Sequence, residues 1–284
     1  MEHGKGDCAE GVQLKNIVFG PGILCVYAHA GVIDALVDVD RSDVEAVSGS
    51  SAGAIAALIF CLHRVRPFRI AQILEANLHD VVDAADAVNL FKRFSLIPAR
   101  RWTSFLENVM EKAGFDVSLT FEDLRRESGV ELHVSSFDLN SRKFVYFSSE
   151  SHPKVRCIDA VAASTSIPLI FENRTDILTD ARLCDAAVLE RYPLLPFVDD
   201  LESTLIVELD REKPKKRPTS FPASVWELVE VGSPVEDAAV VARIARRIIL
   251  TPPVSVSNYR MSLGEKRILY DYGYQATLTA FREG

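Results

Sequence analysis

The sequence has no long hydrophobic run, no histidine beyond residue 152, no cluster of metal ligands and no excess of positive charge. Its longest unbroken run of apolar or small residues, Ala52–Leu62, is too short to span a bilayer, so we expect at most peripheral membrane contact. The start of the chain, Met1–Cys8, is polar and lacks the apolar stretch of a signal peptide. The formal net charge of −8 argues against nucleic acid as a partner.

The cysteines show no pattern of disulfide or metal binding. There are five, and their odd number and scattered positions predict reduced thiols in a cytoplasmic protein. No group of cysteines and histidines has the spacing of zinc ligands. The sequence therefore predicts no metal and no cofactor.

The length and the hydrophobic content suit one large α/β domain. The chain has 284 residues, of which 48% are hydrophobic, enough for a sizeable core. We predict a single domain over residues 1–284, with a core at about 14–210, a helical cap-like insert at about 64–114 and a helical extension at about 219–284. The insert keeps helical spacing without a strand signal, and Val235–Leu250 is predicted to form a helix.

Short apolar segments separated by turn residues predict the strands of a sheet. Leu205–Leu209 is the last strand expected, and two of the earlier ones form a hairpin closed by an Asp- and Asn-containing turn. The predicted strands before it are Lys15–Phe19, Val44–Val47, Glu131–Phe137 and Lys143–Phe147, and the predicted helices of the core are Leu24–Leu36, Ala52–Leu62 and Ile158–Ala163.

The stretch from Gly49 to Gly53 carries the chemistry. It reads Gly-Ser-Ser-Ala-Gly, which fits the G-x-S-x-G nucleophile elbow with Ser51 at its centre. A strand precedes it and an Ala-rich helix follows it, so the Ser51 hydroxyl is expected to project from a sharp strand-to-helix turn. The two glycines, Gly49 and Gly53, allow a close backbone approach there. The N-terminus of the helix would favour a developing oxyanion.

The histidines of this sequence do not stand in the order that an α/β-hydrolase triad of Ser51, Asp185 and a histidine would need. An α/β-hydrolase places its histidine after its acid, and no histidine follows Asp185. Asp185 lies in a run of low polarity, where burial raises a carboxylate pKa and makes it a better base. Local sequence alone also fits an ordinary helix N-cap at Asp185. His133 and His152 are the histidines that stay open as alternatives.

Three ordered motifs resemble the patatin-like phospholipase family. Gly49–Ala54 resembles the family's elbow, Ala162–Pro168 its Ala-Ser-x-x-Ile-Pro segment, and Asp185–Ala187 stands at the place of its Asp-Gly-Gly or Asp-Gly-Ala motif. The resemblance covers about residues 16–196. It implies a three-layer α/β/α sandwich with a central, mostly parallel sheet, a Ser51–Asp185 dyad, and hydrolysis of lipid esters without a metal.

Two features depart from the family's pattern. Ala186 replaces a glycine, which is acceptable only with a negative φ. The glycine-rich oxyanion loop reads Gly20-Pro21-Gly22-Ile23. In a register without a gap, the oxyanion donors are the N–H groups of Gly22 and Ile23. A register aligned on Gly20 would instead put Pro21, which has no N–H, in a donor position.

Two other hypotheses remain at this point. The first is a non-catalytic lipid-binding relative with an impaired oxyanion loop, and the second is an α/β-hydrolase esterase with a functional histidine. A basic loop near residues 211–217 is more simply a solvated run of charge, with contact to anionic lipid as the alternative. Its residues are Arg211, Lys213, Lys215, Lys216 and Arg217, with Phe221 and Trp226 nearby. The oligomeric state does not follow from the sequence.

Overall fold

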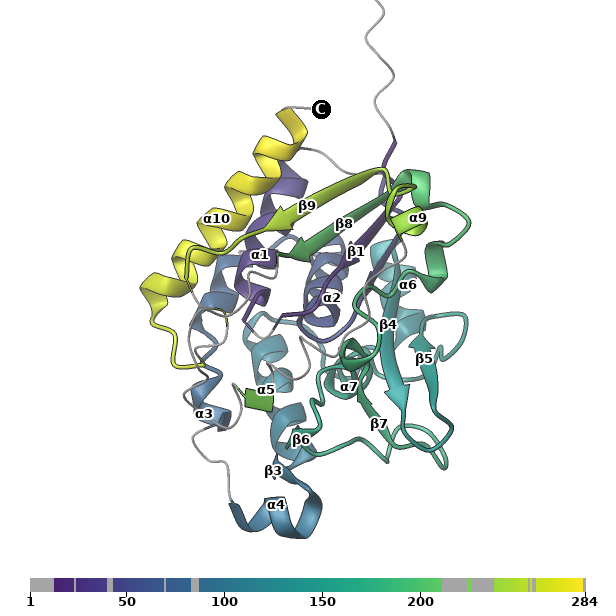
Figure 1. The fold of residues 1–284 in the computed structure, drawn as a ribbon, viewed down its shortest axis with the longest axis vertical. Coiled ribbons are helices and arrows are strands. Elements are labelled where there is room, and N and C mark those ends of the chain that lie inside the picture. The colour runs from purple at the N-terminus through teal and green to yellow at the C-terminus, as the bar shows by residue number, and fades with distance from the viewer. Residues whose placement is uncertain are drawn as a thin grey trace, which may run out of the picture.

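A seven-stranded sheet runs through the molecule (Figure 1). The computed structural model describes residues 13–22, 24–39, 43–68, 70–82, 87–210, 224–225, 238–254, 256 and 259–282. The strands follow the order β5-β4-β2-β1-β8-β9, and β7 pairs with β4. Only β5 and β7 are antiparallel to their neighbour. The bounds are β1 (Asn16–Phe19), β2 (Ala46–Gly49), β4 (Glu131–Asp138), β5 (Lys143–Phe147), β7 (Leu183–Asp185), β8 (Thr204–Leu209) and β9 (Arg246–Leu250).

The central strands are buried along their whole length. Every residue of β1 and β8 is buried, as expected for parallel strands that are covered on both faces. In the parallel register, Phe19 lies beside Gly49 on one side and Val207 on the other. The carboxyl ends of β1, β2 and β8 therefore meet at one edge, which brings the loop after Phe19 next to the elbow.

Helices cover one face of this sheet and shorter helical turns cover the other. The first face carries α1 (Val26–Asp38), α2 (Ala52–Val65), α6 (Phe121–Ser128), α7 (Cys157–Ser164) and α10 (Leu263–Arg282). On the second face, Val18 and Ile206 pack with residues of η3 (Leu195–Phe197), η4 (Leu201–Ser203) and the segment after α9 (Ala238–Val241). The predicted α/β/α fold with a mostly parallel sheet is confirmed.

Helix α10 packs closely on α1 through two glycines. A Cβ atom on Gly31 would lie 1.9 Å from the carbonyl oxygen of Tyr270, and one on Gly273 would lie 2.0 Å from that of Ala28. Any side chain at these positions would push the helices apart. The Tyr274 hydroxyl adds a 2.5 Å hydrogen bond to Asp38. The end of the chain is thus fastened to the first helix of the core.

The insert contains a strand that the sequence did not predict. It comprises η1 (Ile70–Glu75), α3 (His79–Val82), α4 (Ala87–Arg93), β3 (Ser95–Ile97) and α5 (Ala99–Lys112). Strand β3 pairs in parallel with β6 (Leu169–Phe171) in a separate two-stranded sheet. The expectation of a wholly helical insert was wrong because three residues are too few to show a period of two, and their partner lies far along the chain.

The helix predicted over Val235–Leu250 was also wrong in its second half. Strand β9 occupies that part and pairs in parallel with β8, so Leu205–Leu209 is not the last strand. Within β9, Ile248 and Leu250 are buried, whereas Ile249 is 49% exposed. This alternation is the period of an edge strand, and it was hidden by arginines whose spacing resembled that of a helix.

Three smaller expectations concern single residues and segments. Four cysteines, Cys25, Cys61, Cys157 and Cys184, are buried free thiols. Cys8 and the basic loop with Phe221 and Trp226 lie outside the described residues. None of the helices in the described ranges is long and apolar enough to cross a membrane.

Candidate active site

Ser51 occupies the sharp turn between β2 and α2. Its backbone has φ 53° and ψ −128°, a region that residues with a side chain rarely adopt. A Cβ on Gly49 would lie 2.1 Å from the carbonyl oxygen of Gly53, and a Cβ on Gly53 would lie 1.9 Å from that of Phe19. Both glycines are therefore required by backbone contacts. They hold Ser51 at the N-terminus of α2, where it is only 3% exposed.

The segment that follows α7 fastens the elbow and the acid to the same support. The backbone N–H of Ser51 donates to Ser164 Oγ at 3.1 Å, and Ser164 Oγ donates to the carbonyl oxygen of Ser135 at 2.6 Å. Two residues later, the carbonyl oxygen of Ser166 accepts the N–H of Asp185 at 3.0 Å. The Ala-Ser-x-x-Ile-Pro motif was noticed in the sequence only as a resemblance. The structure shows that it positions both Ser51 and Asp185.

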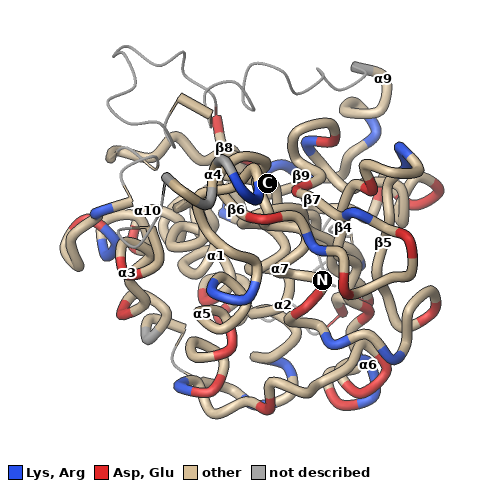
Figure 2. Tube along the Cα trace, turned by 90° about the horizontal axis from the view of Figure 1, so that it is seen from below, with Lys and Arg blue, Asp and Glu red and all other residues tan. Residues whose placement is uncertain are grey.

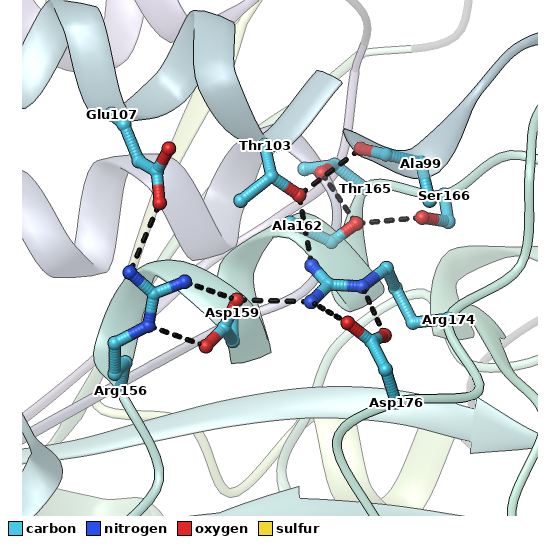
Figure 3. A network of polar contacts seen from close by, with 10 residues as sticks. All are labelled: Ala99, Thr103, Glu107, Arg156, Asp159, Ala162, Thr165, Ser166, Arg174 and Asp176. Atoms are coloured by element: carbon cyan, nitrogen blue, oxygen red, sulfur yellow. Dashed lines mark hydrogen bonds and ion pairs between the residues drawn. The ribbon is translucent and has the colours of Figure 1, made fainter. Parts of the chain in front are cut away.

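A network of charged side chains around the buried Arg174 holds α5 of the insert against α7 (Figure 3). Arg174, which is 5% exposed, donates to Asp159 on α7 and to Thr103 on α5, both at 2.9 Å. Arg156 extends the network from Asp159 to Glu107. Beside it, Trp102 Nε1 of α5 donates to Thr165 Oγ1 at 2.6 Å. The insert is thus locked to the segment that supports the elbow.

Asp185 ends β7 and is fully buried. Its Oδ1 accepts the N–H of Ala187 at 2.9 Å, which caps the short helix η2 (Ala186–Val188). The helix-cap interpretation and the active-site interpretation of Asp185 are therefore compatible, because the cap orients the carboxylate. Ala186 is not among the described residues with positive φ, so alanine replaces the family's glycine there without strain.

The surroundings of Asp185 make it a weak acid. Burial raises its pKa to about 7, although the Ser51 hydroxyl and the Ala187 N–H lower it part of the way back. No hydrogen bond of ordinary length joins the Ser51 side chain to Asp185, and Asp185 Oδ2 has no hydrogen-bond partner in the described part of the chain. Catalytic hydrogen bonds are often long before substrate binds.

Two further buried hydroxyls near Ser51 and Asp185 also lack partners. They are the side chains of Ser50, which precedes Ser51, and Ser136, which lies opposite Asp185 in the β4–β7 pair. Neither has a hydrogen bond within the ranges that the structure describes. Buried polar atoms without partners are rare and often mark places where a substrate or a water molecule binds.

The oxyanion loop lies against the start of α2. A Cβ on Gly53 would lie 2.8 Å from the carbonyl oxygen of Gly20, so the loop and the helix N-terminus are in contact. The Gly20 N–H donates to Val207 at 2.8 Å and is used by the sheet. The N–H of Gly22 has no hydrogen bond in the described part of the chain, which leaves it available. Ile23, the second predicted donor, lies outside the described residues.

The histidines do not reach the serine or the acid. His133 packs edge-on against Phe197, and His152 packs against Phe147 and contacts Ser151. His29 is buried, with a pKa lowered to about 3 by burial. None of the five described histidines has a hydrogen bond or ion pair with Ser51 or Asp185. His3 lies outside the described residues.

An apolar slot runs along α2. Positions 55, 58, 59 and 62 repeat at helical spacing and share one face of α2, which begins one residue after Ser51. The slot has a volume of about 60 Å³ and adjoins a cavity of about 560 Å³ between η1, α3 and α5. The lining of the slot is apolar and comes mostly from α2, α5 and α7, with Phe68, Ile73 of η1 and Ala113 completing it; the residues of the three helices are Ile55, Leu58, Ile59, Leu62, Leu106, Val109, Met110, Ile158 and Val161.

The sequence matches the patatin-like phospholipase family over residues 17–198. This range includes the elbow, the segment after α7 and Asp185. The chain belongs to the patatin-like phospholipase family. It is thereby an enzyme of the lipid acyl hydrolase class, which confirms the resemblance drawn from the motifs. No curated protein matches the sequence.

Solved structures of low sequence identity share the patatin-like fold. VipD from Legionella pneumophila is 16% identical with a TM-score of 0.56, covering 95% of this chain and 67% of its own. Human GIVD cytosolic phospholipase A2 is 12% identical with a TM-score of 0.53, covering 96% and 61%. The same human enzyme in complex with methyl γ-linolenyl fluorophosphonate is 14% identical, with a TM-score of 0.50 and coverage of 96% and 60%. This chain therefore spans about two-thirds of these proteins or less.

Proposed function

We propose that this patatin-like protein cleaves ester bonds of phospholipids or related lipids with a Ser51–Asp185 dyad. The observation that carries the proposal is the buried carboxyl of Asp185. Its pKa of about 7 suits a general base at neutral pH, and its Oδ2 is free to accept a proton. Ser51 is the hydroxyl that lies near it, and it is held in the strained turn of a nucleophile elbow.

The reaction proceeds through a covalent acyl-enzyme. Ser51 Oγ attacks the ester carbonyl carbon and transfers its proton to Asp185. The developing oxyanion accepts a hydrogen bond from the N–H of Gly22 and lies near the positive end of α2. In the gap-free register, the N–H of Ile23 is the second donor. Asp185 then protonates the leaving alcohol. Water, deprotonated by Asp185, attacks the acyl-enzyme and releases the fatty acid and Ser51.

The apolar slot supports a lipid acyl chain as the group that is transferred. Its walls are apolar on α2, α5 and α7, and its lining residue Ile55 follows Ser51 by one helical turn. The larger cavity is lined in part by Glu75, Asp80 and Lys112, so the apolar slot is the part that suits an acyl chain. A polar acyl group would lose its hydration there without gaining hydrogen bonds. Cytoplasmic location and peripheral membrane contact belong to the same proposal.

Hydrolysis of a panel of labelled phospholipids by the parent and by Ser51→Ala tests this proposal. We expect Ser51→Ala to lose activity by about four orders of magnitude or more. The variant should unfold at the same temperature as the parent. Serine and alanine tolerate the backbone of this turn equally, and the hydrogen bond from the backbone N–H of residue 51 to Ser164 stays. Equal turnover by the two proteins would end the assignment of the nucleophile. Chelators are expected to leave the parent's activity unchanged.

The alternative is a non-catalytic lipid-binding relative with an impaired oxyanion loop. A fluorophosphonate separates the two, since only an activated serine reacts with it. The human relative named above was solved with an inhibitor of this class. Labelling of the parent but not of Ser51→Ala supports the enzyme, whereas an unlabelled parent that still binds lipid supports the alternative.

A further inference from the structure

Two large apolar side chains stand exposed at the tip where the insert meets the segment after α7. Phe94, between α4 and β3, is 77% exposed, and Leu169, the first residue of β6, is 45% exposed. Ser95 lies opposite Leu169 in the β3–β6 pair, so Phe94, which precedes β3, is one residue away from the strand partner of Leu169. We call these two residues the apolar tip. It lies at the lower end of the molecule in Figure 1.

Both residues of the apolar tip have an unfavourable backbone conformation. Phe94 has φ 55° and Leu169 has φ 69°. Glycine, asparagine and aspartate adopt this region at lower cost than phenylalanine or leucine. The other described non-glycine residues with positive φ are polar, namely Ser51, Arg142 and Asp180. At the apolar tip, Phe94 is 77% exposed and gains little from burial within the chain, whereas Leu169 is 45% exposed and keeps part of its burial. Such an outlier points to a function.

Basic residues lie near the apolar tip in the sequence of a protein with an acidic net charge. Residues 87–106, between Asp86 and Glu107, contain four basic residues and no acidic one, although the whole chain has a formal charge of −8. Arg93 pairs with Glu172 at 3.0 Å, whereas Lys92, Arg100 and Arg101 are exposed and have no ion pair among the described residues. Figure 2 looks onto this end, where blue stretches lie near the α4 and α5 labels with red stretches beside them.

The apolar tip is joined directly to the supports of the dyad. Leu169 follows Ser166, whose carbonyl oxygen accepts the N–H of Asp185, by three residues. On the other side, Trp102 of α5 packs on Phe171 of β6 with ring centroids 4.6 Å apart. A membrane or other surface that contacts the apolar tip would therefore touch a segment that is continuous in sequence with the one that positions Ser51 and Asp185.

We propose that the apolar tip docks this protein on an anionic phospholipid bilayer. Phe94 and Leu169 enter the boundary between headgroups and acyl chains, while Lys92, Arg100 and Arg101 contact the phosphates. An apolar wedge ringed by cations matches a surface with apolar chains beneath anionic headgroups. The choice of a bilayer rests on the proposed function, since the bilayer supplies the lipid ester.

Sedimentation with vesicles tests the apolar tip without turnover. All variants are made in the Ser51→Ala protein, so failure of the dyad leaves the binding result untouched. The vesicles contain two parts of phosphatidylcholine to one part of phosphatidylglycerol, at low ionic strength. We expect Phe94→Asn with Leu169→Asn to weaken binding roughly tenfold or more, because two apolar groups no longer leave water. Asparagine tolerates the left-handed backbone, so the fold is kept.

Matched variants separate this proposal from a general loss of affinity. Ile249→Gln removes an apolar side chain of similar exposure on the edge strand β9 and should leave binding unchanged. Phe94→Trp should keep it, since tryptophan suits the interface. Arg100→Gln with Arg101→Gln should weaken binding roughly tenfold or more, while both changed to lysine should retain it. The effect of the arginines should fade at high salt.

Three results would overturn the proposal. The first is a Ser51→Ala protein that does not bind these vesicles. The second is equal binding by the double asparagine variant, with thermal unfolding showing that it is folded. The third is an equal loss in Ile249→Gln. Hydrolysis of a water-soluble short-chain ester by the parent and by Ser51→Ala is measured separately, and it judges only the dyad.

Discussion

The elbow and the apolar tip each hold a residue with almost the same positive φ, and they differ in what surrounds it. Ser51 has φ 53° and Phe94 has φ 55°. Ser51 is 3% exposed and is enclosed by the contacts of Gly49, Gly53 and Ser164. Phe94 is 77% exposed.

This difference shows where the strain is balanced in each case. At the elbow, the sheet, the helix and the Ser164 hydroxyl fix the backbone on every side, so the fold itself holds the nucleophile in place. At the apolar tip, the described chain offers Phe94 no comparable enclosure. The stability of the fold as a whole carries the strain at Phe94 in the absence of a partner, and a surface that covers the side chain would add the burial that is missing there, which is the physical basis for proposing a bilayer.

Replacing Gly53 by alanine should have the largest effect on folding. The added methyl group would lie 1.9 Å from the carbonyl oxygen of Phe19, so β1 and α2 would have to separate. We expect a loss of about 3 kcal/mol or more in the free energy of unfolding. Chemical denaturation measures it, with Gly129→Ala as a control that adds a methyl group without contact, since no atom lies within 4 Å of a Cβ there, and that carries only the smaller cost of alanine at φ 71°. A loss at Gly53 no larger than that at Gly129 would contradict the close packing of the elbow.

Asp185→Asn should stabilise the fold, and more so as the pH rises. The pKa of Asp185 is about 7 in the folded protein against 3.8 as its ordinary value, so between these values the unfolded state ionises and the folded state does not. The parent therefore loses stability from about pH 4 to pH 7, by as much as roughly 4 kcal/mol. Asparagine does not ionise, so the variant's advantage should grow across this window.

Asp138→Asn provides a control of opposite sign. Burial alone would raise the pKa of Asp138, but the Ser141 side chain and the backbone N–H groups of Arg182, Asn140 and Ser141 hold it at about 2. Its stabilising effect is present above pH 4 and is lost as the pH falls toward 2. Unfolding curves of both variants at several pH values make the comparison. For each variant the compared quantity is its difference from the parent in the free energy of unfolding. If this difference changed with pH in the same direction for both variants, the burial of an uncompensated charge at Asp185 would be contradicted.

Phe94→Asn should raise stability by about 1 kcal/mol, because asparagine adopts the left-handed region at lower cost. The measurement is the midpoint of chemical denaturation in the absence of lipid. Leu169→Asn should behave in the same way, whereas Ile249→Gln, on a regular strand, should not gain. If Phe94→Asn lowered the stability instead, the Phe94 side chain would already make stabilising contacts within the protein that offset its backbone strain.

Much of the fold and of the site follows from local sequence. Strands β1, β2, β4 and β5, helix α2 and the elbow are local patterns, and Asp185 was found through a motif. By contrast, β3 and β9 depend on partners distant in sequence. The supporting role of Ser164 and Ser166 depends on contacts with Ser51 and Asp185 that no local pattern encodes. The same holds for the apolar tip, since positive φ at Phe94 has no sequence signal.

Pro21→Gly should have the smallest effect. In the gap-free register the donors are Gly22 and Ile23, and Pro21 contributes only stiffness to the loop. We expect kcat to change little, or to fall as the loop loosens. A gain of roughly a hundredfold in kcat would show that Pro21 stands in a donor position and that the oxyanion hole is impaired.

The rate at which a fluorophosphonate labels Ser51 as a function of pH tests the dyad most directly. In the parent, His133→Ala and His152→Ala, we predict that the rate rises with pH around the Asp185 pKa of about 7, because the carboxylate must be ionised to accept the serine proton. Asp185→Asn should react about 10⁴-fold more slowly and lose this pH dependence. Labelling of Asp185→Asn at the parent's rate, or its loss in a folded histidine variant, would contradict a Ser51–Asp185 dyad.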